Sequence, residues 1–272
     1  MRKMLFAALL LLPVTAAHGG ALAPHRAIYD LVRDPSAPGT QVDRAQGRIA
    51  FQLTGNECDG YAVMLRQVTS LDTGEGQVTV SDLRSESWEN ALATSYRFKT
   101  QNFVNEQIRE NVNGTAMRQR NGALTVRVLQ PKPASFALDG PLVLPTEHTR
   151  KMLAAAERGD KTLSVRVFDG SPDGKKIYST LTVIGEPVAP GVGTPPPSPA
   201  LADFKRYPVV ISYFEMGTGE RTPAYTLAFD LYENGISGAL RLNYGNFALK
   251  GVLSSVELLP QKPCKAPPAK SK

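Results

Sequence analysis

Two cysteines, Cys58 and Cys264, are the side chains of this sequence best suited to react with each other. Two cysteines allow only one connectivity, and an oxidising compartment favours their pairing. The alternative is redox catalysis, but the chain has no Cys-x-x-Cys motif, and a catalytic pair usually needs a thiolate of low pKa beside its partner. The sequence therefore predicts a structural disulfide between Cys58 and Cys264.

Histidine chemistry is limited to three residues, His18, His25 and His148. Because the two cysteines are distant in sequence and no histidine pair has ligand spacing, we expect no metal site. A nucleophile elbow and a phosphate-binding loop are also missing from the sequence, so we expect no cofactor and no enzymatic activity. His148 is interpreted as a packed or capping histidine, and a role as general base is the alternative.

Charged side chains gather in the segment 81–90. If this segment is a strand, its alternation puts four residues on one face: Asp82, Arg84, Glu86 and Trp88. Glu89 then lies on the opposite face from Glu86, which argues against a pair of carboxylates for glycoside hydrolysis.

The single tryptophan, Trp88, belongs to this segment. One interpretation is a cross-strand ladder of ion pairs beside a packed Trp88. The other places Trp88 at the mouth of a ligand cavity, with Tyr96 and Phe98 of the next strand nearby. The sequence leaves both interpretations open.

The elements that must position these residues are mostly strands. Apolar and polar residues alternate with period two in five clear segments: 49–53, 61–65, 124–128, 163–167 and 225–231. The chain holds 23 glycines and 21 prolines, and turn dipeptides such as Asp59-Gly60 and Asn113-Gly114 separate the apolar runs. We expect an all-β fold of about a dozen antiparallel strands, whose sheet must close, curl or stack to protect its edges.

One segment, 146–158, has helical periodicity instead. Thr146 is its expected N-cap, Glu147 lies in the first turn, and Gly159 follows as the terminating glycine. The face that we expect on the sheet carries His148, Thr149, Met152, Leu153, Ala155 and Ala156. This amphipathic helix is interpreted either as ordinary core or as the lining or plug of a ligand cavity. The candidate cavity-lining residues are Trp88, Tyr96, Phe98, His148, Met152, Leu153, Ala155 and Ala156.

The N-terminus predicts export. Arg2 and Lys3 precede an apolar run, 4–14, and small residues continue through Ala23. That run is too short to span a bilayer as a mature helix, and no second run of about 18 apolar residues follows, so we expect no integral membrane protein. The expected division is a signal peptide and leader at 1–23, one domain at 24–260 with a proline-rich loop at 185–200, and a tail at 261–272 that contains the second cysteine.

The net charge of +6 arises at the two ends of the chain. The tail carries Lys262, Lys265, Lys270 and Lys272 and no acidic residue, whereas 24–260 holds 25 basic and 25 acidic residues. This balance does not favour the basic surface that a nucleic acid needs, so we expect no nucleic-acid partner.

Several short motifs occur in a characteristic order along nearly the whole mature chain. They are Ala23-Pro24-His25-Arg26-Ala27-x-Tyr29, Cys58-Asp59-Gly60-Tyr61, Leu144-Pro145-Thr146-x-His148, Asn243-Tyr244-Gly245-Asn246-Phe247 and the final Cys264. In this combination the sequence resembles the EipB family of alphaproteobacterial periplasmic cell-envelope integrity proteins. The proline-rich loop at 185–200 has no counterpart in the resemblance.

The resemblance implies one long antiparallel sheet wound into a spiral or broken barrel, with a helix inside it and the disulfide fastening its end. It also implies a periplasmic location, a role in envelope integrity, and a shape like that of lipid and lipoprotein carriers. We therefore expect a non-enzymatic protein that binds a lipid, lipoprotein or peptide in a curved sheet. The alternative is a structural scaffold that docks a periplasmic partner such as a tetratricopeptide-repeat protein.

Overall fold

The computed structural model describes residues 21–37, 42–74, 76–193, 198–216, 222–261 and 263–264. The first eight strands are β1 (His25–Arg33), β2 (Arg44–Asn56), β3 (Gly60–Asp72), β4 (Val78–Glu89), β5 (Ser95–Val104), β6 (Gln107–Arg118), β7 (Leu124–Gln130) and β8 (Ala134–Leu138). After helix α1 (Pro145–Arg158) come β9 (Thr162–Val167), β10 (Tyr178–Ile184) and the short 3-10 helix η1 (Pro199–Leu201). The last strands are β11 (Arg206–Glu215), β12 (Tyr225–Tyr232), β13 (Ser237–Asn243) and β14 (Ala248–Leu258).

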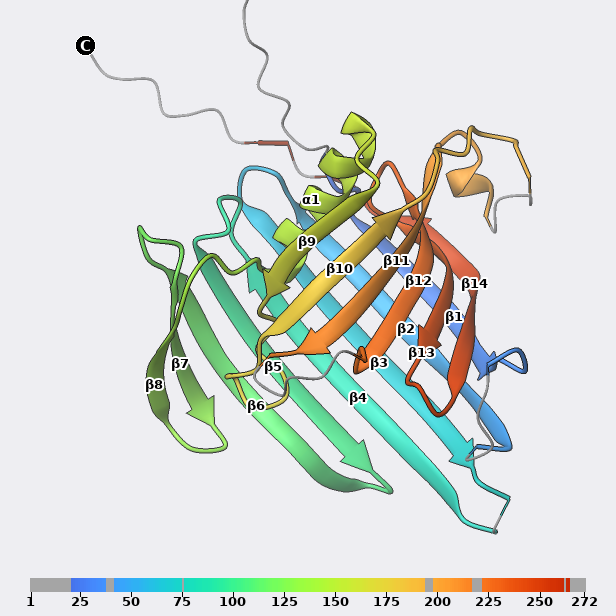
Figure 1. Cartoon of the computed structure of the whole chain (residues 1–272), viewed down its shortest axis with the longest axis horizontal. Helices are drawn as coiled ribbons and strands as arrows, with labels where there is room; N and C mark the ends of the chain where they lie inside the picture. The colour runs from blue at the N-terminus through green and yellow to red at the C-terminus, as the bar shows by residue number, and fades with distance from the viewer. Residues whose placement is uncertain are drawn as a thin grey trace, which may run out of the picture.

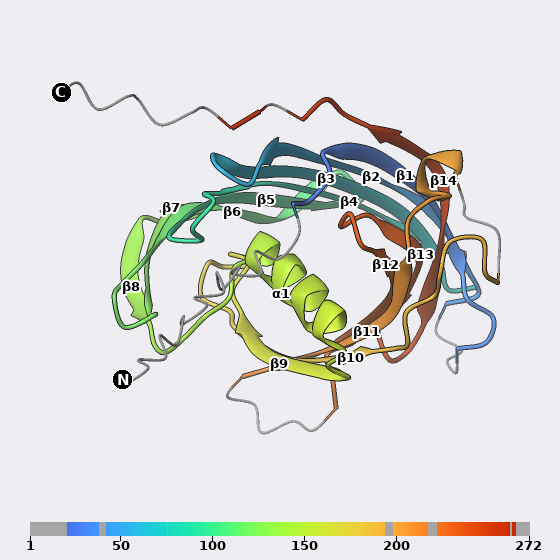
Figure 2. The ribbon, with the colours of Figure 1, turned by 90° about the horizontal axis from the view of Figure 1, so that it is seen from above.

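The strands form one antiparallel sheet of fourteen, in the order β8-β7-β6-β5-β4-β3-β2-β1-β14-β13-β12-β11-β10-β9 (Figure 1). The pairing of β1 with β14 joins the two halves of the chain. Because β8 and β9 stand at opposite ends of this order, the sheet of described residues is open. It curls around α1, which connects its two end strands (Figure 2). The expected all-β spiral with an internal helix is confirmed.

The curl follows from the alternation of side chains along each strand. In β1, Ala27, Tyr29 and Leu31 are buried on the concave side, whereas Arg26 is exposed on the outer side. The outer side carries exposed ion pairs, such as Arg48 with Asp30, which contribute little to stability. The concave side carries the buried apolar residues, whereas the outer side mixes charged residues with exposed apolar ones such as Met64 and Val252, so the sheet has a single buried face, and α1 covers part of it.

The apolar face of α1 packs against the later strands of the sheet. Leu153 and Ala155 are fully buried in one cluster with Val209, Ile211 and Leu231. Within the described part of the chain, no helix is long and apolar enough to cross a membrane.

The dipeptide Asn113-Gly114 is not the turn that the sequence suggested, because it lies inside β6. The register between β6 and β7 shifts at this point. A Cβ atom on Gly114 would lie 2.7 Å from Cζ of Phe98 and 2.6 Å from the carbonyl oxygen of Arg127. The glycine is therefore needed for close packing within the sheet.

Candidate ligand cavity and the anchoring of the helix

A cavity of about 350 Å³ lies between α1 and the concave face of the sheet. Its size falls in the range of small-molecule sites, and such sites are typically apolar with a few polar groups. Side chains of β1, β2, β3, β11, β12 and β13 form its walls together with one face of α1. The curl of the sheet therefore brings residues from both halves of the chain around one space.

The strand register arranges the walls in layers. Tyr213 pairs with Tyr225 at one end of the cavity, and Ile211 pairs with Leu227 in the next layer. Leu227 in turn pairs with Leu242, and Phe229 with Leu240. Because side chains two positions apart share a face, the cavity runs from a tyrosine-lined end to an aliphatic and aromatic interior.

The tyrosine-lined end is a packed aromatic group. The rings of Tyr213 and Tyr225 stack with centroids 4.4 Å apart, and Tyr178 meets both of them edge-on. Burial raises the pKa of the Tyr213 and Tyr225 hydroxyls, and the nearby carboxyl of Asp169 acts in the same direction. Both hydroxyls are therefore neutral groups that can donate hydrogen bonds.

Helix α1 contributes His148, Thr149 and Met152 to the cavity wall. His148 is 4% exposed, and its Nε2 atom has no hydrogen-bonding partner among the described residues. Burial lowers the pKa of His148 to about 4, so the imidazole is neutral at neutral pH.

The other predicted residues of the helix face lie beside the cavity rather than in its wall. Leu153, Ala155 and Ala156 are buried in the cluster that joins α1 to the sheet. They hold the helix in place, because their small or aliphatic side chains allow a close contact with the strands.

Tyr96 and Phe98 are buried on the concave face but belong to a different apolar cluster, which contains Phe168. The ring centroids of Phe98 and Phe168 are 5.7 Å apart. The Tyr96 hydroxyl donates to the carbonyl oxygen of Asp169 at 3.0 Å. The two aromatic side chains therefore support the loop that brings Asp169 to the cavity.

Trp88 lies on the outer face, away from Tyr96 and Phe98, which differs from the hypothesis that placed it at a cavity mouth. It pairs with Arg97 in the β4–β5 ladder, and the Arg97 guanidinium lies 4.4 Å from the centroid of its ring. The pair that points inward is the adjacent one, Glu89 with Tyr96. Successive side chains of a strand point to opposite faces, so Trp88 cannot share the concave face with Glu89.

The outer face of β4 also carries the expected ladder of ion pairs. Asp82 accepts from Arg66 at 2.9 Å and from Arg84 at 2.6 Å. These two hydrogen bonds lower the pKa of Asp82 to about 2, which is the direction expected for a carboxylate between two guanidinium groups.

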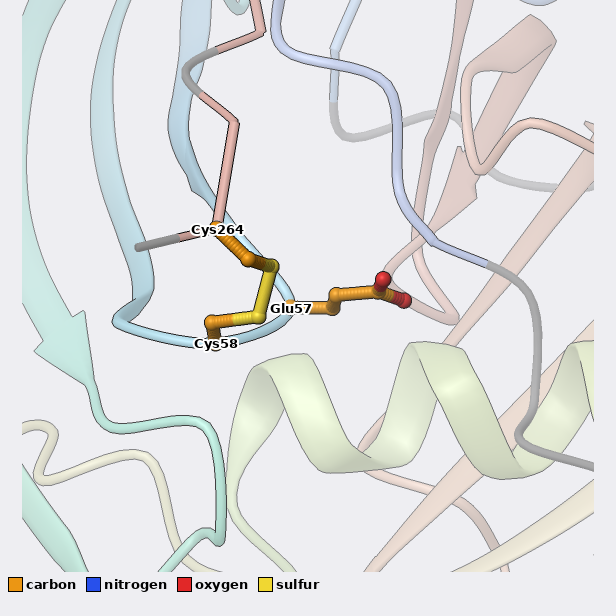
Figure 3. Close-up of side chains that lie close together, drawn as sticks. All are labelled: Glu57, Cys58 and Cys264. Atoms are coloured by element: carbon orange, nitrogen blue, oxygen red, sulfur yellow. A yellow bond between two sulfur atoms is a disulfide. The ribbon is translucent and has the colours of Figure 1, made fainter. Parts of the chain in front are cut away.

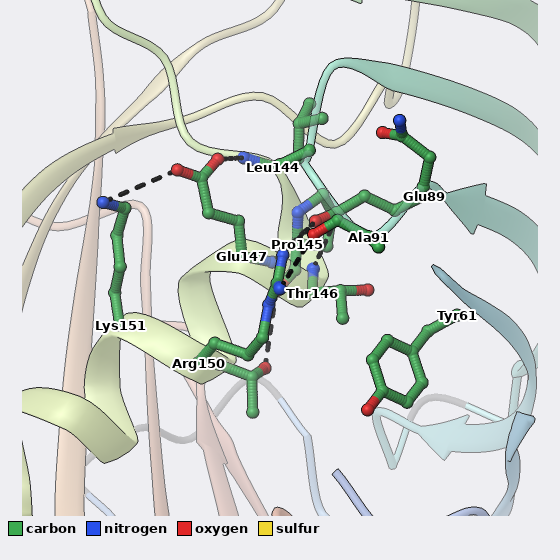
Figure 4. Close-up of polar contacts among 12 residues, drawn as sticks. Tyr61, Glu89, Ala91, Leu144, Pro145, Thr146, Glu147, Arg150 and Lys151 are labelled. Carbon is green, nitrogen blue, oxygen red and sulfur yellow. Dashed lines mark hydrogen bonds and ion pairs between the residues drawn. The ribbon is translucent and has the colours of Figure 1, made fainter. Parts of the chain in front are cut away.

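Glu89 is the functional residue that sequence reasoning missed (Figure 4). It ends β4, is 2% exposed, and accepts hydrogen bonds from the backbone N–H of Thr146 at 2.8 Å and of Glu147 at 2.9 Å. Arg150 lies 3.6 Å from its Oε1 atom. Glu89 therefore caps the first turn of α1 from another element of the fold.

This contact corrects the expected start of the helix. The N-cap is Leu144 rather than Thr146, and Pro145 takes the first helical position, where its missing N–H costs nothing. The expected end holds, since Gly159 has the left-handed φ of 82°. The alternation of β4 put Glu89 and Trp88 on different faces but did not show which face is buried, so no local signal in the sequence identified this cap.

The disulfide between Cys58 and Cys264 is confirmed, with a Cα–Cα distance of 5.7 Å (Figure 3). It fastens the segment after β14 to the turn between β2 and β3. Among the described residues, one group could bring three metal-ligating atoms within 4.8 Å of one another, and it consists of Glu57 and these two cysteines. Because both sulfur atoms are bonded to each other, neither is a thiolate.

The open sheet, its internal helix and the cavity between them define the class as a β-barrel-like protein whose barrel is not closed. A sequence profile described as EipB-like matches residues 16–260, and the chain belongs to the EipB-like family. The resemblance inferred from the motifs is thereby confirmed.

A relative and a solved structure, both from Brucella abortus, are similar to this chain. The chain is 30% identical to cell envelope integrity protein EipB over 245 residues, which are 90% of this chain and 87% of the relative. It also resembles the crystal structure of a β-barrel-like protein with a domain of unknown function, at a TM-score of 0.80 and 30% identity. That match covers 88% of this chain and 99% of the solved one. The chain is therefore related to a protein of cell envelope integrity.

Proposed function

We propose that this chain is a periplasmic protein that maintains the cell envelope by binding, without catalysis, the apolar part of a lipid, lipoprotein or peptide between α1 and the sheet. The observation that carries the proposal is the cavity of about 350 Å³ between α1 and the concave face. Its relation to a cell envelope integrity protein supports the location and the cellular role.

The character of the interior supports an apolar occupant. Leu227, Phe229, Leu240 and Leu242 face the cavity from neighbouring strands, and Met152 faces it from the helix. Burying an apolar chain against such side chains contributes roughly 25 cal/mol for each Å² removed from water. The flexible thioether of Met152 lets the wall adapt to occupants of different shape.

The contacts that anchor α1 favour a role for the helix as a fixed wall of the cavity rather than as a mobile lid. Glu89 binds two backbone N–H groups of its first turn, and Arg118 donates to Glu147 at 2.7 Å. Arg150 also donates to the carbonyl oxygen of Ala91 at 3.0 Å. These contacts tie the N-terminal half of the helix to the end of β4, the β4–β5 connection and the end of β6, so a ligand would enter without displacement of this end.

The test is native mass spectrometry of protein purified gently from the periplasm of cells that express the full chain. Wild type is expected to carry an adduct of lipid or peptide mass. Met152→Trp should fill the cavity and remove the adduct, whereas Met64→Trp, on the exposed outer face, should retain it. A folded wild-type protein without any adduct, and with no binding of a fluorescent acyl probe, would contradict the proposal.

The scaffold function with a tetratricopeptide-repeat partner stays a prediction. Crosslinking in intact cells separates the two functions, because a scaffold should recover the partner equally well with wild type and with Met152→Trp. A ligand carrier whose partner binding depends on cargo should lose that partner in the same variant.

A further inference from the structure

The side chains at the tyrosine-lined end of the cavity can form hydrogen bonds but carry no positive charge. Tyr213, Tyr225 and Gln67 line this end together with the acidic Asp169, and His148 lines the same cavity from α1. Gln67 belongs to this end because its side chain bonds to Tyr244, whose ring lies 6.4 Å from that of Tyr225. Residues from β3, β11, β12 and the loop after β9 thus converge on one polar region.

Among the described residues that line the cavity, none is a lysine or an arginine. The cation that influences Asp169 is Lys176, which pairs with Glu215 and lies 5.2 Å from the centroid of the Tyr178 ring. The carboxyl of Asp169 accepts from the backbone N–H and the hydroxyl of Ser171, each at 2.9 Å. A carboxylate or phosphate head group entering here would lose water without gaining a positively charged partner, which is unfavourable.

His148 supplies an independent sign that a polar group of a ligand belongs in this region. Its side chain lines the cavity, it is 4% exposed, and its Nε2 atom has no partner among the described residues. A neutral imidazole presents one donor and one acceptor, and a buried polar atom left unpaired costs about 1–3 kcal/mol. A ligand hydroxyl can both donate and accept, so it suits either tautomer.

We infer that the cavity binds single-chain amphiphiles whose head group is uncharged and bears hydroxyls, in preference to fatty acids with the same chain. The head group lies among Tyr213, Tyr225 and His148, and the chain runs along the layers of Leu227 and Phe229 towards Met152. The inference rests on the proposed function, because it names the class of ligand for the same cavity.

Isothermal titration calorimetry with monolauroylglycerol, laurate and laurylamine, each below its micelle concentration, tests this selectivity. The three probes share one saturated chain and differ in the charge of the head group. Monolauroylglycerol is expected to bind at least about tenfold more tightly than laurate, whose carboxylate would lie beside Asp169 without a cationic partner. It should also bind more tightly than laurylamine, whose ammonium cannot accept the hydrogen bonds that the tyrosine hydroxyls donate.

Variants locate the head group. The double variant Tyr213→Phe with Tyr225→Phe, and separately His148→Phe, should weaken the binding of monolauroylglycerol about three- to tenfold by removing hydrogen bonds. The matched control is Tyr207→Phe, because Tyr207 is buried in the sheet but does not line the cavity. Circular dichroism of each variant establishes that it is folded.

The outcomes separate the inference from the proposed function. Equal or tighter binding of laurate or laurylamine would overturn the inferred selectivity and leave a lipid-binding function standing. Unchanged affinity of monolauroylglycerol in both tyrosine and histidine variants would overturn the placement of the head group. If none of the three probes bound to folded wild type, the proposed acyl binding would itself be wrong.

Discussion

Glu89, at the end of β4, accepts a hydrogen bond from the backbone N–H of Thr146 at 2.8 Å, across 57 positions of sequence. The helix inside the spiral is thus capped by the sheet that surrounds it. The first N–H groups of a helix lack intrahelical partners, and burial makes an external acceptor necessary. This contact ties the position of α1, and so one wall of the cavity, to β4.

Removing the cap is expected to destabilise the fold. Glu89→Ala leaves two backbone N–H groups unpaired in a buried site, and we expect a loss of about 2–3 kcal/mol in the free energy of unfolding. The matched control, Glu86→Ala, changes an exposed residue on the outer face of the same strand and should stay within about 0.5 kcal/mol of wild type. Urea unfolding measures both, and equal midpoints for the two variants would contradict the capping role.

Glu89 and His148 should give opposing pH dependences. Burial raises the pKa of Glu89 to about 7, so its stabilising contribution is fully present below the unfolded pKa of 4.5 and is lost as pH rises through 7. Burial lowers the pKa of His148 to about 4, so its contribution is present above the unfolded pKa of 6.5 and is lost as pH falls towards 4. Between pH 5 and 7 each group changes the free energy of unfolding by about 2 kcal/mol, and because the two changes have opposite signs they nearly cancel.

Single substitutions should separate these two effects. His148→Phe retains only the effect of Glu89, so this variant should be more stable at pH 5 than at pH 7. Glu89→Gln retains only the effect of His148, so this variant should be less stable at pH 5 than at pH 7. The measurement is the urea midpoint at both pH values. A wild-type pH profile retained in both variants would show that neither group is responsible.

The disulfide should stabilise the chain without being needed for its topology. Cys58→Ser frees the segment after β14 from the turn between β2 and β3, while the pairing of β1 with β14 remains. We expect a loss of about 2–4 kcal/mol, less than the roughly 5 kcal/mol that loop closure alone gives for so long a loop. Reduced wild type is the control and should match the variant. A variant as stable as oxidised wild type would leave the disulfide without a stabilising role.

Gly114 should tolerate no side chain. A Cβ atom there would approach Phe98 and the backbone of Arg127 closer than van der Waals contact allows. Gly114→Ala is therefore expected to cost about 1–3 kcal/mol by overpacking. Adding Phe98→Leu should recover part of that loss, and a double variant no more stable than Gly114→Ala would exclude the ring as the obstacle.

Local pattern was sufficient for much of the architecture. Alternation identified strands around Ile49, Tyr61 and Tyr225, and the 3.6-residue period with Gly159 identified the single helix and its end. These features depend on residues within a few positions of one another, which is why they can be predicted from the sequence alone. The pairing of Cys58 with Cys264 was also predictable, because two cysteines leave only one connectivity.

Contacts between distant segments decided the rest. The sequence divided the side chains of β4 between two faces, but only the curl of the sheet showed that Glu89 points inward to the helix and Trp88 outward to Arg97. The same curl brought Tyr213 and Tyr225 of the sheet and His148 of the helix into the wall of one cavity. A strand's period of two specifies which residues share a face, whereas the direction in which that face points depends on burial against elements far away in the chain.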